Sequence, residues 1–188
     1  MLNLSCLNHL HCTMIRPHIS LLFFFLFLHT AGMAQYPGWQ QAVDYSMEIA
    51  LDTALHQYDG TMRVTLKNNS PDDLTKAYFH LFFNAFQPGS MMDVRSRNIS
   101  DPDRRVGSRI FELPEEEWGW IGVASLNVNG KPVEFSHDGT LLDVTLNSAI
   151  RAGKKATFEM AWTAQVPRQI RRSGWMNKEG VEYSMTQW

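Results

Sequence analysis

Hydrophobic and polar side chains alternate over residues 45–66, and this alternation predicts antiparallel β-strands. The first run alternates small or polar residues with four apolar ones, namely Tyr45, Met47, Ile49 and Leu51. The same pattern resumes over residues 62–66. Period-two alternation is typical of a strand with one face on a core and the other in water. Asp59-Gly60 separates the two runs and is typical turn chemistry, so we expect the hairpin turn there.

The rest of the chain adds further short strands separated by turn residues. After a polar break at 68–73, the apolar run 77–83 predicts a third strand, and Asn129-Gly130 predicts another hairpin turn. Pro132 confines the strand that follows this turn to a sheet edge or a strand start. Further strands are expected at 121–129, 133–135, 142–146, 158–166 and 181–188. The pattern therefore predicts a mainly β fold, an antiparallel β-sandwich or saddle-like domain.

Residues 90–108 differ in kind from these strands, because they are polar and contain Asp101-Pro102 and Gly107. We interpret the segment as a long loop. Residues 91–97 within it could instead form a helical turn.

The N-terminus has the order of features found in a secretory signal peptide. Arg16 precedes an apolar run at 19–28, and Gly32 and Ala34 supply the small residues that precede a cleavage site. The run is too short for a transmembrane helix, which needs about 20 apolar residues. We expect residues 1–34 to be a signal peptide and the protein to be exported, whether periplasmic, on the cell surface or released. Met14 is a candidate for the true start.

Composition narrows the remaining choices. The chain has 188 residues, which suits one domain, so we expect a lead-in at 35–42 and one β-domain at 43–188. The formal net charge of −2 gives no basic footprint for nucleic acid. The cysteines, Cys6 and Cys12, both lie in the expected signal peptide. The β-domain therefore offers neither a disulfide nor a thiolate metal site.

Few residues are candidates for chemistry. A zinc peptidase needs two histidines one helical turn apart with a glutamate beside them, whereas His56, His80 and His137 are scattered. We therefore predict neither a catalytic residue nor a metal ligand in this chain. The acidic triplet at 115–117 is more typical of a solvated turn than of a calcium loop.

Two clusters leave alternatives open. Trp118 and Trp120 could stack on sugars or peptides, or could plug the edge of the β-core. The cluster of Arg168, Arg171 and Arg172 could bind an anion or an acidic partner, or could be a solvated loop or an interface.

Five segments, taken together in their order and spacing, resemble one known family. Residues 44–52 and 58–66 resemble the opening of the N-terminal domain of zinc aminopeptidases of the alanyl-aminopeptidase type, the gluzincin metallopeptidases of peptidase family M-one. Residues 68–72 and 79–86 are similar to secreted bacterial members, and 183–188 is similar to the segment that leads into their catalytic domain. The resemblance covers about residues 43–188.

The resemblance implies a non-catalytic N-terminal β-domain, here truncated at its C-terminal end. In the family this domain packs on a catalytic domain that holds zinc, and a glutamine near its end helps to bind the N-terminal residue of the peptide substrate. Gln187 matches that glutamine. The zinc motif, the third zinc ligand and the catalytic tyrosine of the family lie beyond the position of Trp188. The chain by itself is therefore expected to be inactive and to contain no cofactor.

A second hypothesis needs no missing domain. The chain could be a stand-alone exported β-sandwich module that binds sugar or protein through Trp118, Trp120 and the polar segment 90–108.

Overall fold

The computed structural model describes residues 38–99 and 107–185. The chain divides into two units, 1–39 and 40–188, and the fold described below is that of the second unit. The expected signal peptide at 1–34 lies outside the described residues.

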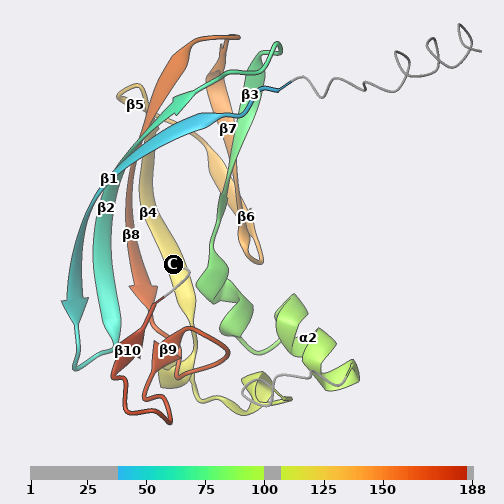
Figure 1. Ribbon diagram of the computed structural model, residues 1–188, viewed down its shortest axis with the longest axis vertical. Helices are drawn as coiled ribbons and strands as arrows, with labels where there is room; N and C mark the ends of the chain where they lie inside the picture. Colours follow the sequence, from blue (N-terminus) through green and yellow to red (C-terminus); the bar gives the residue numbers. More distant parts are fainter. Residues whose placement is uncertain (1–37, 100–106, 186–188) are drawn as a thin grey trace, which may run out of the picture. The chain divides into compact units, whose positions relative to one another are not determined.

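The larger of two main sheets has five antiparallel strands in the order β1-β2-β8-β4-β5 (Figure 1). Its strands are β1 (Ala42–Asp52), β2 (Gln57–Lys67), β8 (Lys155–Gln165), β4 (Trp120–Val128) and β5 (Lys131–Pro132). β8 lies in the middle, paired with β2 on one side and β4 on the other, and its alternating apolar positions are buried along its whole length. The turn after β4 has Asn129 and Gly130 at positive φ, so this hairpin prediction is confirmed. The two-residue strand β5 forms one edge of the sheet, as Pro132 predicts.

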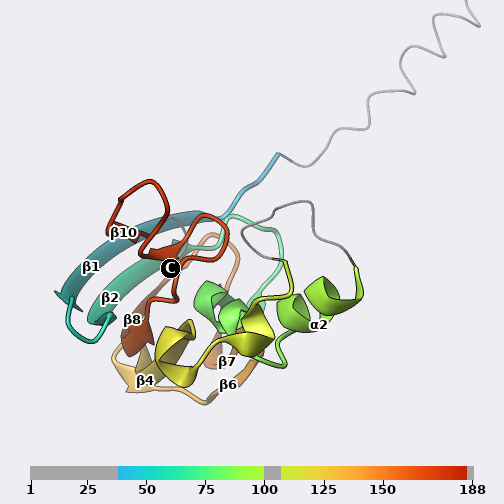
Figure 2. The same cartoon turned by 90° about the horizontal axis from the view of Figure 1, so that it is seen from below.

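The second main sheet has three strands and packs on the first. Its order is β3-β7-β6, formed by β3 (Leu74–His80), β7 (Leu141–Ile150) and β6 (Phe135–Asp138). The view from below shows β7 and β6 facing the larger sheet across the core (Figure 2). Leu142 and Val144 on β7 and Phe158 on β8 are almost wholly buried in this core. The prediction of a mainly β, antiparallel fold is confirmed.

Short elements close the lower end of the core in Figure 1. They are the 3-10 helices η1 (Phe82–Phe86), η2 (Ile110–Glu112) and η3 (Glu115–Glu117), and a two-stranded ribbon of β9 (Gly174–Trp175) and β10 (Tyr183–Ser184). The helix α2 (Met91–Asn98) lies in the polar segment expected to be a loop, and it confirms the helical alternative. Its first turn is capped, because the Ser90 hydroxyl accepts a hydrogen bond from the Asp93 amide at 3.1 Å.

The first hairpin turn lies earlier than the sequence predicts. The chain turns at 53–56, where Asp52 Oδ1 accepts hydrogen bonds from the amides of Ala54 at 2.8 Å and Leu55 at 3.1 Å. Asp59-Gly60 instead lies inside β2. The glycine is needed there for space rather than for a turn, because Gly60 pairs with Trp162 and the indole ring lies over it.

Two other strands are shorter in the structure than the sequence predicts. The third strand ends at His80, because the chain then turns into η1 and buries Phe83 completely. Of the strand expected at 181–188, the described part forms only β10. Among the described residues, no helix is long and apolar enough to cross a membrane.

Candidate functional site

The apolar side of β1 is uncovered, and this is the main departure from the sequence prediction. Five alternating side chains, Val43, Tyr45, Met47, Ile49 and Leu51, are between 37% and 59% exposed. The strand was expected to bury one face, but all of its residues are exposed to solvent. Because these side chains share the face of the sheet that forms the core, β1 extends the core face into solvent.

The core face is covered only over its middle strands. Phe79 on β3 packs edge-on against Phe158 on β8 with ring centroids 5.6 Å apart, and Val64 on β2 is 2% exposed. The three-stranded sheet does not extend as far as β1, which among the described residues has β2 as its only neighbour in the sheet. Alternation in the sequence indicates that one face of a strand is apolar, but it does not indicate which element covers that face. The exposure of β1 could therefore not be predicted from the sequence.

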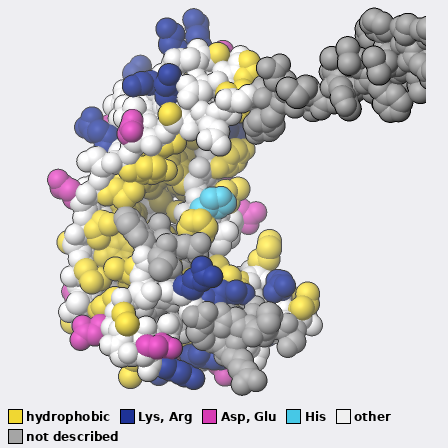
Figure 3. Space-filling model, viewed as in Figure 1, with side chains coloured by type: hydrophobic (Ala, Val, Ile, Leu, Met, Phe, Trp, Pro, Cys, Tyr) yellow, Lys and Arg dark blue, Asp and Glu magenta, His cyan; other side chains and the backbone are white. Residues whose placement is uncertain are grey.

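A hollow of about 270 Å³ lies between β1 and the end of β3. Tyr45 and Met47 line its β1 side, and Tyr78 and Phe82 line the opposite side. His80 stacks on Phe82 with ring centroids 5.2 Å apart, so this histidine also lies at the hollow. Hydrophobic side chains gather around a hollowed region in the space-filling view (Figure 3). We call the five apolar side chains of β1 together with this hollow the uncovered face.

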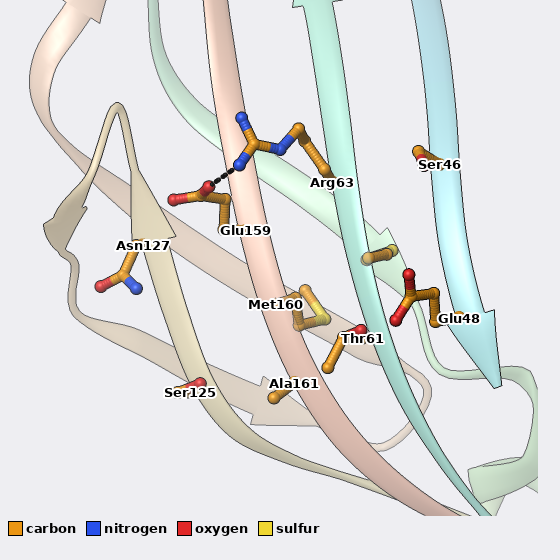
Figure 4. Close-up of a pocket in the computed structure, with 10 residues that line it drawn as sticks. Ser46, Glu48, Thr61, Arg63, Ser125, Asn127, Glu159, Met160 and Ala161 are labelled. Carbon is orange, nitrogen blue, oxygen red and sulfur yellow. Dashed lines mark ion pairs between the residues drawn. The ribbon is translucent and has the colours of Figure 1, made fainter. Parts of the chain in front are cut away.

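The opposite side of the five-stranded sheet is polar. A shallow groove of about 390 Å³ runs over β1, β2, β8 and β4, lined by small or polar residues such as Ser46, Thr61 and Asn127. Arg63 on β2 forms an ion pair of 2.6 Å with Glu159 on β8. Figure 4 shows Arg63 reaching toward Glu159 and away from Glu48 on β1. The two sides of β1 therefore have opposite character.

The lower end of the sheet holds the β9–β10 ribbon through a compact aromatic cluster. The His56 ring stacks on Trp175 with centroids 3.9 Å apart and planes inclined by 6°. His56 Nδ1 lies 2.6 Å from the Tyr183 hydroxyl, which donates to the Thr53 carbonyl at 3.2 Å. Partial burial raises the pKa of Tyr183, and nearby Glu182 and Asp52 raise it further. The cluster joins the turn at 53–56 to the β9–β10 ribbon, and we call it the clasp.

The three histidines considered as metal ligands lie in separate places. His56 belongs to the clasp, His80 lies at the hollow, and His137 lies on the exposed part of β6. Within residues 38–99 and 107–185, no group of three or more His, Cys, Asp or Glu side chains is placed to hold a metal ion.

Trp118 is used to build the fold. Its indole nitrogen donates to the Leu113 carbonyl at 2.8 Å, and its ring packs against the core. This favours the plugging interpretation of Trp118 over sugar stacking.

One arginine of the basic cluster pairs with one glutamate of the acidic triplet at the surface of the fold. Arg168 Nη1 forms an ion pair of 2.7 Å with Glu117, and its guanidinium lies 6.0 Å from the centre of the Trp175 ring. Arg168 therefore already has a carboxylate partner in the fold, and this argues against an external anion site at that residue. Gln187, the predicted substrate-binding residue, lies outside the described residues.

Comparisons with known proteins give no family assignment by sequence. No family model matches the chain, and no curated protein matches it. Among solved structures, an M1 zinc metallopeptidase from Deinococcus radiodurans has a TM-score of 0.46 and 16% identity, covering 77% of this chain and 26% of its own. A mutant M1 zinc metallopeptidase from the same organism, bound to a Tyr-Ser-Ala substrate, has a TM-score of 0.46 and 15% identity. That match covers 76% of this chain and 26% of the metallopeptidase. The chain thus spans about a quarter of the length of these proteins. At this degree of likeness, family membership has to be argued from the chain's own residues.

Proposed function

We propose that this chain is the non-catalytic N-terminal β-domain of an exported zinc aminopeptidase. In this proposal the domain packs on a zinc-containing catalytic domain through the uncovered face, and Gln187 helps to bind the N-terminus of the peptide substrate. The support comes from the order and spacing of the family-like segments at 44–52, 58–66, 79–86 and 183–188. The observation that carries the packing role is the exposed apolar side of β1.

The uncovered face suits a domain interface because of its composition and its position. It continues the core face of the sheet without a polar boundary, since Met47 on β1 pairs with Met62 on β2 and Tyr45 pairs with Val64. Covering each half-exposed side chain would contribute on the order of 1 kcal/mol at about 25 cal/mol per Å². Contiguous apolar surface of this kind is typical of a protein interface rather than of a free surface.

The role of Gln187 rests on amide chemistry. A glutamine side chain can accept a hydrogen bond from a protonated amine through its oxygen and donate through its nitrogen. Recognition of a free N-terminus needs the acceptor, because an ammonium group has only donors. The zinc that activates water and the base that takes its proton belong, in this proposal, to the catalytic domain.

The family assignment is tested by the gene. We expect the reading frame to continue past the codon for Trp188 into a His-Glu-x-x-His motif with a further glutamate downstream. A stop codon followed by unrelated sequence would refute the assignment.

The packing role is tested in the longer protein by two neighbouring substitutions on β1. Ile49→Lys places a charge on the uncovered face, and Ala50→Lys places the same charge on the opposite side of the strand. We expect Ile49→Lys to loosen the interface, seen as faster proteolysis between the domains and lower aminopeptidase activity, and Ala50→Lys to change neither. Equal effects of the two variants would argue against packing through this face.

The substrate-binding role has its own variant. In the longer protein, Gln187→Ala is expected to lower kcat/KM for aminoacyl substrates about tenfold or more, the size of one lost hydrogen bond to a charged group. The loss should appear mainly in KM, and Gln187→Glu should retain most of the affinity because it keeps the acceptor. An unchanged KM in Gln187→Ala would remove the residue from the site.

A further inference from the structure

The outer edge of β1 has no partner strand among the described residues. β1 is the last strand of the five-stranded sheet, and within residues 38–99 and 107–185 its 11 residues pair only with β2. It contains neither proline nor glycine, so its outer main-chain groups can pair along the whole strand. A long, regular edge of this kind is a template for another strand.

The two sides of β1 indicate what kind of strand would fit. The uncovered face is apolar, whereas the other side contains the carboxylates Asp44, Glu48 and Asp52 at alternate positions. Asp52 caps the following turn, and neither Asp44 nor Glu48 forms an ion pair with any described residue. Two cations of β2 lie on this side. Arg63, opposite Ser46, is directed to Glu159 (Figure 4), and Lys67, opposite Ala42, lies at the end of the strand.

A second copy of β1 is a poor partner for this edge because of charge. In an antiparallel pair centred on Glu48, the two Glu48 residues would face each other, and each Asp44 would face an Asp52. In the register centred on Ser46, each Asp44 would face a Glu48. Like charges directly opposite one another in a β-pair are destabilising. The register centred on Met47, which pairs the whole strand, avoids direct opposition, but it places each Glu48 diagonally next to Asp44 and Glu48 of the other strand. The sequence of β1 therefore disfavours pairing with itself in each of these registers.

We propose that β1 binds an extended cationic peptide segment as a sixth strand of the sheet, with apolar side chains alternating with lysine or arginine. The apolar side chains of that segment lie beside Tyr45 and Met47 and reach the adjacent hollow. Its cations lie on the other side, next to Asp44 and Glu48. This inference concerns the outer edge of β1 and is tested on this chain by itself. Because it also uses Tyr45, Met47 and the hollow, the peptide and a catalytic domain would compete for these side chains.

The test uses the full chain and a fluorescently labelled nine-residue peptide of alternating valine and lysine, capped at both ends. Fluorescence anisotropy is expected to show saturable binding. A matched peptide with glutamate in place of lysine should bind at least tenfold more weakly. A third peptide, with main-chain N-methyl groups along one edge, should not bind, because it cannot complete the ladder of hydrogen bonds.

A charge reversal links the effect to β1. The double variant Asp44→Lys/Glu48→Lys should invert the preference so that the glutamate peptide binds more tightly than the lysine peptide. The control variant, Glu134→Lys/Asp138→Lys, changes net charge equally at exposed positions away from β1 and should keep the original preference. Circular dichroism checks that both variants are folded.

Three results would overturn the proposal. They are equal binding of the lysine and glutamate peptides, binding that survives N-methylation, and a preference that the β1 reversal leaves unchanged. Each can occur whatever the gene encodes beyond Trp188, so failure here is distinguishable from failure of the proposed function.

Discussion

Gly60 on β2 lies opposite Trp162 on β8, and the indole ring fills the space that a side chain at position 60 would occupy. A Cβ atom at Gly60 would lie 2.8 Å from Cη2 of Trp162, and closer still to Cζ2. The glycine thus lets the largest side chain of the central strand lie flat against its neighbour, with Trp162 7% exposed.

Gly60→Ala should therefore destabilise the protein. Overpacking of this kind costs about 1–3 kcal/mol, and the loss is measured as a lower urea midpoint. In a Trp162→Leu background the same substitution should cost much less, because the ring is absent. Gly122→Ala on β4 is the matched control, since its Cβ would have no neighbour nearer than 3.6 Å. A similar cost at both glycines would show that space is not the cause.

Asn68 is expected to be intolerant of substitution because its buried side chain satisfies several groups at once. Its oxygen accepts from Gln41 at 3.1 Å and from the amide and hydroxyl of Ser70 at 3.0 and 2.6 Å. Its nitrogen donates to the carbonyls of Asp72 at 2.7 Å and Ile150 at 2.9 Å. Asn68→Ala should lower the free energy of unfolding by about 3 kcal/mol, since buried partners lose their bonds.

Asn68→Asp tests the hydrogen-bond donor of the side chain separately, because it replaces the amide nitrogen and keeps an acceptor oxygen. At pH 7 a carboxylate would face two carbonyl oxygens, so this variant should be less stable than Asn68→Ala. Protonation restores a donor, and the gap between the two variants should narrow between pH 7 and pH 4 in urea titrations. A constant gap would contradict the donor role of the amide.

Tyr58 should make stability fall at alkaline pH. Burial raises the pKa of Tyr58 above its usual value of about 10, although a hydrogen bond with Trp162 opposes the shift. Above pH 10 the unfolded chain releases this proton and the folded chain keeps it, so the free energy of unfolding decreases as pH rises. Urea midpoints at pH 9 and pH 11 measure the drop. Tyr58→Phe should reduce the drop, and an identical drop in this variant would assign it to other groups.

The clasp should control local opening of the β9–β10 ribbon. His56→Ala removes the stack on Trp175 and the hydrogen bond to Tyr183, so amides in 168–184 should exchange hydrogen faster by about 5- to 10-fold, equivalent to about 1 kcal/mol. Amides in β8 should keep their protection. Tyr183→Phe, which loses the hydroxyl alone, should have a smaller effect. Equal acceleration in β8 would indicate global destabilisation instead.

Local patterns in the sequence determined the elements of this fold. Alternation located β1, β2, β4, β7 and β8, because a strand on a core face repeats every two residues. Asn129-Gly130 located a hairpin, because both residues tolerate positive φ. The polar segment 90–108 was ambiguous, because the Ser90 cap and the Asp93–Arg97 ion pair of 3.1 Å stabilise a helix with little apolar pattern.

Only the tertiary structure decided what covers each face and why particular residues are required. Asp59-Gly60 has the composition of a turn, yet Gly60 is required by Trp162, about a hundred residues away in the chain. The alternation in β1 is as clear as that in β8, yet β8 is buried and β1 is exposed. Alternation depends only on the order of apolar and polar residues within a strand, whereas burial depends on how far a second sheet extends over that strand. That second property arises from contacts between distant segments, which no local pattern records.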